Sequence, residues 1–431
     1  MKDHKDVVAC VVDHGMVGLP IAERLARDMK HVYFFSHWEE GQPSFSKCIV
    51  GDGLENVERA LDVWEIKEEV DLFVFPDVQE SGLQKELESQ GKAVWGSRDG
   101  DIQELDREVF LQTLGDIGLL IPPHEVVIGV SSLRRMLKEK EDYYVKMSLF
   151  RGSFETTHWR SWKLDAPWID SLGVRFGPYS ERMRFICFPN IDTPLEIGFD
   201  TYNVVGEWPK KLLHGVEYKD RSYLGAVTDL FDMPRQVREV MTAFGPVLAK
   251  ENFRNQFSGE IRVKGKDSYF IDPTCRFGLP STPSQLELWK NWSEIVWHGA
   301  NGELVEPIPL GKYSAEAILT LSGDHSEWRM ADVPKELKQW MKLADYCEHD
   351  GLVCFPSSET PGTDDVGWLV AVGDSPQEVI KKLGKQADDL PDGLEANVEH
   401  LAYVIKEIQV AEKQGIEFGK SPLPKPGFVV E

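Results

Sequence analysis

The sequence predicts a mixed α/β and α+β fold, in which an N-terminal parallel α/β domain and a C-terminal α/β domain flank a body containing a β-hairpin. Residues 7–100 alternate short apolar strands with helices, which is the order typical of a parallel sheet. Residues 257–281 contain two strands joined by a polar turn. Strands and helices alternate again over residues 312–412. We therefore expect domains at 1–100, 101–305 and 306–412, with a tail over 413–431.

Composition and charge indicate an ordinary globular protein with an acidic surface. The chain has 431 residues, of which 42% are hydrophobic and 28% charged, enough for several cores. A net charge of −24 repels phosphate backbones, so we expect no nucleic-acid polymer as partner. The six cysteines include no C-x-x-C pair, which argues against a zinc site or a disulfide framework. No apolar run approaches the roughly 18 residues of a bilayer span and the N-terminus lacks a signal-peptide pattern, so we expect a cytoplasmic protein without a membrane partner.

The first strand, 7–12, runs through a glycine-containing turn into a helix over 19–29. A strand, a glycine turn and a helix also begin dinucleotide-binding folds, but the glycines here do not form G-x-G-x-x-G. We favour a plain tight turn and keep a dinucleotide-dependent oxidoreductase as an alternative. The further strands predicted in this domain cover 31–35, 72–76 and 93–96, and the helices cover 55–63 and 83–90.

Beyond residue 100, Asp106 is a predicted helix cap, and the residues that follow it place apolar side chains on one helix face. The remaining predicted strands cover 143–146, 185–189, 196–200, 315–321, 352–355 and 366–372. The remaining helices start at Pro234 and Ser375 or cover 286–297, 334–344 and 394–412.

The turn of the hairpin decides whether two carboxylates meet. A two-residue turn at Gly265-Lys266 would place Glu260 and Asp272 on opposite faces. A three-residue loop, 265–267, would set them directly opposite each other. Two adjacent carboxylates repel unless a cation lies between them, and oxygen ligands of this kind suit Mg²⁺. A surface hairpin with incidental acids is the alternative interpretation.

Lys146 ends a predicted strand beside a short loop that contains Arg151, Gly152 and Ser153. An ammonium group beside loop amides suits the phosphates of a nucleotide. The alternative is a solvated lysine at the end of a strand.

The run IDPTCRFGLPS at residues 271–281 resembles the metal-binding hairpin of the ATP-grasp ligases and is most similar to the phosphoribosylamine–glycine ligase family. The resemblance implies an ATP-grasp fold in which Glu260, Asp272 and Thr274 hold Mg²⁺ or Mn²⁺ and Arg276 is a catalytic residue facing phosphate. Thr274 stands where the family has Asn, and Asp272 is shorter than the family's Glu.

The same resemblance assigns the other candidate ATP-binding residues. Lys146 corresponds to the family's ATP-binding lysine and is our second catalytic candidate. The motif D-R-x-x-F at residues 106–110 resembles carbamoyl phosphate synthetase at the same place, which implies that Arg107 reaches ATP phosphate. An exposed helix arginine is the alternative. The remaining assignments are a lid formed by Arg151, Gly152 and Ser153, a hinge at Phe188 that reads adenine, and Glu196 lining the site.

The activity implied by this resemblance is an ATP-dependent carboxylate–amine ligase that forms an amide through an acyl phosphate. The implied substrates are small molecules, glycine and a phosphoribosylamine or another nucleotide-type amine, which would place the protein in purine metabolism as a monomer or homodimer. The family's glycine-rich Thr-Gly-Gly-Met-Gly segment is missing here. A catalytically inactive binding or scaffold protein of the same shape is the alternative.

Overall fold

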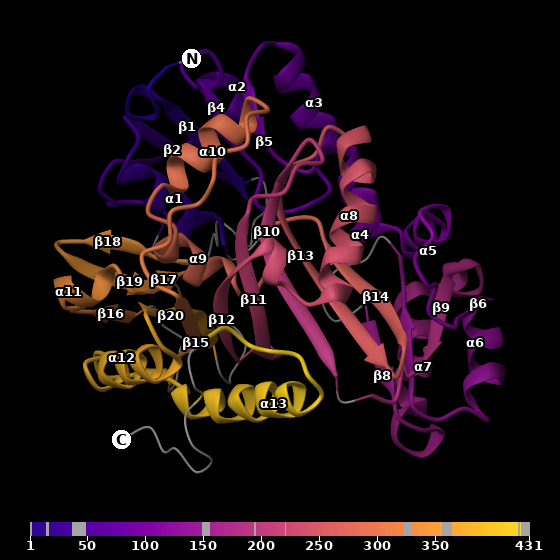
Figure 1. The fold of residues 1–431 in the computed structure, drawn as a ribbon. Helices are drawn as coiled ribbons and strands as arrows, with labels where there is room; N and C mark the ends of the chain where they lie inside the picture. The colour runs from indigo at the N-terminus through magenta and orange to yellow at the C-terminus, as the bar shows by residue number, and fades with distance from the viewer. Residues whose placement is uncertain are drawn as a thin grey trace. The chain divides into compact units, whose positions relative to one another are not determined.

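The computed structural model describes residues 2–13, 17–36, 49–148, 156–193, 195–219, 221–322, 329–355, 364–420 and 423 (Figure 1). These residues form two compact units. Unit 1 comprises residues 1–100, 197–258 and 274–431, and unit 2 comprises 101–196 and 259–273. The predicted 101–305 segment is therefore shared between them. Within the described residues, no helix is long and apolar enough to cross a bilayer.

The N-terminal part of unit 1 is a parallel sheet of five strands in the order β3-β2-β1-β4-β5. Its strands are β1 (Val8–Asp13), β2 (His31–Ser36), β3 (Val57–Arg59), β4 (Leu72–Val74) and β5 (Ala93–Trp95), with helices α1 (Gly18–Ala26), α2 (Val63–Ile66) and α3 (Ser81–Ser89). The strands are almost continuously apolar because both faces of the sheet are covered by separate hydrophobic clusters.

The predicted helix over 55–63 is wrong. Val57–Arg59 is a strand, because it extends the sheet by pairing in parallel with β2, and the helix begins only at Val63. Pairing with a strand distant in sequence outweighed local helix preference, which is a weak determinant for a segment this short.

The rest of unit 1 is built on a long antiparallel sheet. Its strands are β10 (Glu196–Val204), β11 (Lys211–Tyr218), β12 (Ser222–Asp229), β15 (Tyr313–Leu321), β17 (Met341–Leu343), β20 (Asp364–Gly373) and β21 (Leu394–Ala396). A smaller sheet contains β16 (Arg329–Ala331), β18 (Cys347–His349) and β19 (Leu352–Phe355). The helices are α8 (Arg235–Lys250), α9 (Thr282–Leu288), α10 (Trp292–Ala300), α11 (Lys335–Lys338), α12 (Pro376–Asp388) and α13 (Leu401–Lys413). Short 3-10 helices in unit 1 cover His4–Asp6, Leu230–Asp232 and Val398–His400, and Arg98–Asp101 is a fourth at its boundary.

Three predicted helices in this part differ from the structure. The helix expected over 286–297 is split into α9 and α10 around Trp289, which bridges in antiparallel fashion to Pro309. The helix expected over 334–344 stops at Lys338, because Met341–Leu343 pairs with β20. The helix expected over 394–412 begins only at Leu401, because Leu394–Ala396 pairs with β15.

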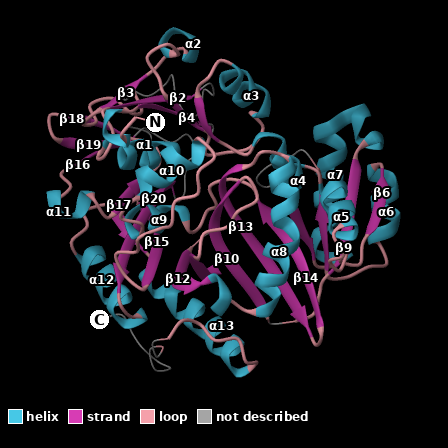
Figure 2. Cartoon of the chain, turned by 45° about the horizontal axis from the view of Figure 1, so that its top comes forward, coloured by secondary structure: helices cyan, strands magenta, loops and turns pink. Residues whose placement is uncertain are grey.

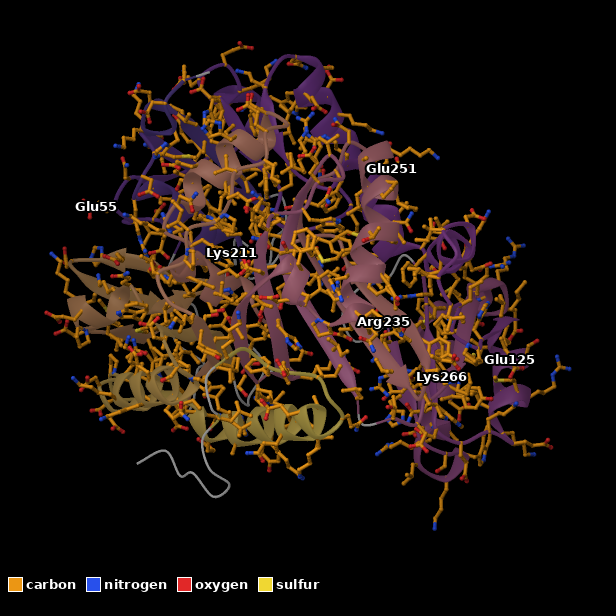
Figure 3. The ribbon with its side chains drawn as sticks, in the orientation of Figure 1. Glu55, Glu125, Lys211, Arg235, Glu251 and Lys266 are labelled. Carbon is orange, nitrogen blue, oxygen red and sulfur yellow. The ribbon has the colours of Figure 1, made fainter. Side chains whose placement is uncertain are left out.

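Unit 2 contains a four-stranded antiparallel sheet in the order β6-β9-β7-β8. The strands are β6 (Glu125–Ile128), β7 (Tyr143–Lys146), β8 (Thr156–Trp159) and β9 (Arg184–Pro189). The helices are α4 (Ile102–Leu105), α5 (Arg107–Asp116), α6 (Val130–Leu137) and α7 (Trp162–Phe176), followed by a 3-10 helix at Gly177–Arg182. An apolar cluster of strand and helix side chains forms part of its core. Figure 3 labels the exposed Glu125 on the edge strand β6.

The predicted hairpin consists of β13 (Arg254–Lys264) and β14 (Asp267–Thr274), which lie side by side (Figure 2). Only Gly265 and the exposed Lys266 separate the strands (Figure 3), and Gly265 has the positive φ of 63° that such a turn needs. The three-residue loop over 265–267 is therefore wrong. If the ladder continues without interruption from this two-residue turn, position 260 pairs with 271, and Glu260 and Asp272 lie on opposite faces.

A buried polar network in unit 1 anchors the segment that follows β14. Ser281 donates its hydroxyl to Asp200 Oδ1 at 2.8 Å and its backbone N–H to Glu316 Oε1 at 3.1 Å. The other oxygen of Glu316 accepts the backbone N–H of Ser284 at 2.9 Å. Burial raises the pKa of Glu316 to about 7, against the opposing effect of these hydrogen bonds. Two buried carboxylates therefore fix the start of α9.

We expect Glu316→Gln to change how stability depends on pH. The pKa of Glu316 is raised on folding, so its contribution is most favourable below pH 4.5 and is lost as the pH rises toward 7. The unfolding free energy of the wild type relative to the variant should fall by up to roughly 3 kcal/mol across this interval. Urea titrations of both proteins at several pH values measure this difference. A difference that stays constant with pH would contradict the raised pKa.

Candidate active site

Two positively charged side chains of unit 2, those of Lys146 and Arg107, meet at Asp272. Lys146 Nζ lies 2.8 Å from Asp272 Oδ1 and 2.6 Å from Oδ2. Arg107 Nη2 lies 2.5 Å from Oδ1, and Arg107 Nη1 donates to the carbonyl oxygen of Ile271 at 2.8 Å. The structure thus brings together three of the residues predicted separately from the sequence.

Regular secondary structure positions both cations, Lys146 and Arg107. Lys146 is the last residue of β7, where it pairs with Thr156 of β8 and Ile186 of β9. Arg107 is the first residue of α5, whose N-terminus is capped by the Asp106 side chain, as predicted. The Arg107 guanidinium also lies over the Phe110 ring, 5.4 Å from its centroid, which is within cation–π range.

Charge neutralisation governs the ionisation of Asp272. Burial disfavours its charged form, but the positive charges and hydrogen bonds of Arg107 and Lys146 outweigh this effect and hold the pKa of Asp272 well below its usual value of 3.8. The side chains of Arg107 and Lys146 are 4% and 11% exposed, whereas that of Asp272 is 31% exposed. The two cations of the site are therefore largely enclosed. The ionised carboxylate that they contact is still partly exposed to solvent.

Other predicted residues of unit 2 lie in less specialised surroundings. Glu196, at the start of β10, accepts a hydrogen bond at 2.8 Å from Arg262 Nε of β13. Phe188 is half-buried on β9 opposite Tyr144 of β7, with its ring 6.0 Å from that of His124. Glu260 is half-buried on β13. Arg151, Gly152 and Ser153 lie outside the described residues.

Arg276 belongs to unit 1, where its Nε lies 3.3 Å from Asp77 Oδ1. Asp77 follows β4, and the backbone N–H of Phe277 donates to the carbonyl of Pro76 at 3.0 Å. The parallel sheet reverses its strand order between β1 and β4, and the carboxyl edge at such a reversal is where open α/β sheets place ligands. Thr274, the last residue of β14, is half-buried in the same unit.

Sequence reasoning missed two charged residues that contact predicted ones. Arg262 pairs with Glu196. The available signal was that Arg262 lies two positions after Glu260 on the same predicted strand, so the two side chains share one face. Asp77 pairs with Arg276, and an acidic residue directly after the Pro76 that ends a buried strand was the available signal.

A cation at this site would have to use oxygen ligands. Among the described residues, no group of three or more His, Cys, Asp and Glu side chains is close enough together to hold a metal ion. Asp272 supplies the oxygens of an ionised carboxylate. Such donors suit Mg²⁺ or Mn²⁺, which also keep several water ligands.

Comparison with known proteins finds likeness in structure alone. No family model matches the sequence, and no curated protein matches it. The solved phosphoribosylamine–glycine ligase of Thermotoga maritima is 14% identical, with a TM-score of 0.69 over 90% of this chain and 99% of that one. The biotin carboxylase domain of the Hydrogenobacter thermophilus 2-oxoglutarate carboxylase, solved with MgADP and bicarbonate, is 12% identical, with a TM-score of 0.63 over 96% of each chain. An L-amino acid ligase from Bacillus licheniformis is 14% identical, with a TM-score of 0.57 over 92% and 99%.

These likenesses confirm the fold predicted from the sequence. The chain has the ATP-grasp fold shared by these enzymes, because the structural alignments span at least 90% of this chain and at least 96% of each solved chain.

Proposed function

We propose that this protein is an ATP-dependent carboxylate–amine ligase. In the proposed reaction a carboxylate oxygen attacks the γ-phosphorus of ATP, ADP leaves, and an amine then displaces phosphate from the acyl phosphate to form an amide. The observation that carries the proposal is the convergence of Lys146 and Arg107 on Asp272. The fold supports it, because the solved structures that share it include ligases and proteins crystallised with ADP.

The chemistry at this cluster is charge compensation. Phosphoryl transfer requires little covalent help from a protein, so catalysis depends on positioning and on stabilising negative charge. Lys146 and Arg107 provide two positive groups with little exposure, and both are held in place by an ionised carboxylate. Nucleotide phosphates that enter here can take over hydrogen bonds that these cations now give to Asp272. The exchange replaces one anion by another and leaves neither cation unpaired.

The carboxylate of Asp272 fits a hard divalent cation, and Thr274 remains a predicted ligand. The positive charges of Arg107 and Lys146 lower the pKa of Asp272, so its carboxylate is ionised at neutral pH and offers oxygen ligands. A bound Mg²⁺ would neutralise phosphate charge and orient the phosphates for in-line transfer. Glu260 remains a predicted third ligand, although the two-residue turn does not set it opposite Asp272. The role of Arg276 as a catalytic residue facing phosphate remains a prediction.

The first substrates to test are glycine and a phosphoribosylamine or a related nucleotide-type amine. The likeness to the Thermotoga maritima phosphoribosylamine–glycine ligase supports this pair. The absence of Thr-Gly-Gly-Met-Gly from the sequence argues for testing other amines beside it. We also propose, on the basis of these substrates, that the protein acts in purine metabolism in the cytoplasm.

A non-catalytic nucleotide-binding or scaffold protein is the second candidate function. It is favoured by the turn between β13 and β14, which separates Glu260 from Asp272 in a regular ladder, and by the two cations that already occupy Asp272. Such a protein would bind ATP without consuming it.

ADP formation separates the two functions. The protein is incubated with MgATP and pooled amino acids and small carboxylic acids, with and without pooled amines, and ADP is measured. The ligase predicts ADP that depends on an acid and increases when an amine is present. The scaffold predicts nucleotide binding by calorimetry with no ADP above background under any pool. Absence of both binding and turnover would overturn both functions.

A further inference from the structure

Two cysteines of unit 1 face each other across a tight hairpin. Cys347 of β18 is the direct partner of Cys354 of β19 in an antiparallel pair. The turn between the strands is Asp350-Gly351, with φ of 51° and 82°, the backbone signature of a two-residue hairpin of type I′. This turn fixes the register, so the two thiols cannot drift apart by strand slippage.

The side chains of the two cysteines pack against each other as a small buried cluster of their own. Cys347 is 6% exposed and Cys354 is fully buried, and neither forms a disulfide in the structure. Directly opposite residues in an antiparallel pair have Cα atoms about 4.5–5.5 Å apart. A disulfide requires about 4.4–6.8 Å between Cα atoms, so the pair meets this requirement without moving the backbone.

We propose that Cys347 and Cys354 are an oxidation site that forms a reversible intrachain disulfide with a low-molecular-weight disulfide as oxidant. In the first step the Cys347 sulfur, as thiolate, attacks the small disulfide, forming a mixed disulfide and releasing one small thiol. In the second step the Cys354 sulfur attacks the Cys347 sulfur of the mixed disulfide, forming the intrachain bond and releasing the second small thiol. Both cysteines are oxidised, the small disulfide is reduced to two thiols, and the two cysteine protons end on those thiols.

The position of the hairpin gives the bond a structural consequence. The strand that carries Cys347 is held to the parallel-sheet region by two backbone hydrogen bonds of 2.8 Å, from Gly51 N–H to the Tyr346 carbonyl and from Glu348 N–H to the Asp52 carbonyl. On the other side, β19 pairs with β16. Among the strands that the structure describes, β18 is an edge strand of this small sheet with β19 as its one neighbour. A bond between 347 and 354 would therefore fasten this edge strand to the centre of the small sheet.

Burial determines the conditions of the test. Burial and the neighbouring Cys347 thiol raise the pKa of Cys354 to about 11, so little thiolate is present at neutral pH and exchange is slow. The full-length protein is therefore equilibrated for long periods in buffers with defined ratios of oxidised to reduced glutathione, and free thiols are then blocked by alkylation. Cleavage after acidic residues cuts between the two cysteines at Glu348 and Asp350, so an intrachain bond leaves the two fragments joined until a reductant is added.

We expect the native protein to yield the fragments of Cys347 and Cys354 joined by a disulfide. The equilibrium constant for forming this disulfide should be at least about tenfold larger in the native protein than in the same chain unfolded in urea. A constant equal to or below that of the unfolded chain, or mixed disulfides alone, would overturn the proposal. Cys354→Ala should abolish the joined product, whereas Cys187→Ala, a buried cysteine of unit 2, should leave it unchanged. The oxidised wild type should also melt at a higher temperature than the reduced protein. Because the comparison between native and unfolded wild type needs no variant, the proposal stays testable if a variant fails to fold.

Discussion

Asp272→Asn is expected to abolish ATP turnover while leaving the protein folded. The substitution keeps the size of the side chain but removes the charge that holds Lys146 and Arg107 and the ligand proposed for the metal ion. A loss of at least about 100-fold in kcat for ADP formation follows, because a displaced charge-stabilising group costs this much in comparable sites. The measurement is ADP release at saturating MgATP, at several concentrations of Mg²⁺ or Mn²⁺.

The same substitution should lower stability in a pH-dependent way. The folded pKa of Asp272 is depressed, so its stabilising contribution is present above pH 3.8 and is lost as the pH falls below that value. We expect Asp272→Asn to cost on the order of 1–2 kcal/mol at neutral pH, a modest value because the side chain is partly exposed to solvent, and almost nothing at strongly acidic pH.

Asp267→Asn is the matched control for Asp272→Asn. Asp267 begins the same strand and its side chain is exposed, so the substitution removes one negative charge from the hairpin without touching the cluster. This control should retain wild-type turnover and stability. Full activity in Asp272→Asn, or equal losses in both variants, would show that the Asp272 carboxylate has no special role.

Lys146→Met should have the second largest effect. Methionine keeps an unbranched side chain of similar length at the end of β7 but removes the ammonium group that lies 2.6 Å from Asp272 Oδ2. If this ammonium binds nucleotide phosphate, turnover should fall by about 100- to 1,000-fold, with weaker binding of MgATP measured by calorimetry. Lys138→Met, an exposed lysine after α6 in the same unit, should change neither quantity.

The double variant tests whether the two residues act together. Residues within one ion-pair network give non-additive effects, so Lys146→Met combined with Asp272→Asn should lose little more activity than the worse single variant. Losses that multiply would indicate two independent roles. Nucleotide affinity unchanged in Lys146→Met would contradict the assignment of Lys146 to phosphate.

The sequence was informative where burial on both faces or a local cap determined the structure. The apolar runs at Val7–Val12 and Leu72–Pro76 predicted strands of the parallel sheet because few other arrangements bury them. Asp106 predicted the start of α5 because capping is a local interaction. Short segments such as Val57–Arg59 and Met341–Leu343 could not be assigned in this way, because their conformation comes from partners distant in the chain.

In the candidate site, too, the local features could be predicted from the sequence, whereas the contacts between distant residues could not. Lys146, Arg107 and Asp272 were each predicted from a local pattern together with resemblance to a family. Their meeting depends on the fold, because Lys146 and Asp272 lie 126 positions apart on strands of different sheets. The partner of Arg276 could not be predicted because Asp77 lies about 200 positions earlier in the sequence, a separation that only the fold closes. The length of the turn was misjudged, since Gly265 allows either loop and only the structure shows which one forms.

Transfer of oxygen from the acid to phosphate tests the central claim most directly. The protein is given MgATP, amines and the pooled acids labelled with ¹⁸O in their carboxylates, and the released phosphate is analysed by mass spectrometry. An acyl phosphate predicts that each phosphate formed carries one labelled oxygen, and that Asp272→Asn and Lys146→Met release almost none. ADP released with unlabelled phosphate would show that ATP is cleaved by water rather than by a carboxylate, and would contradict the ligase.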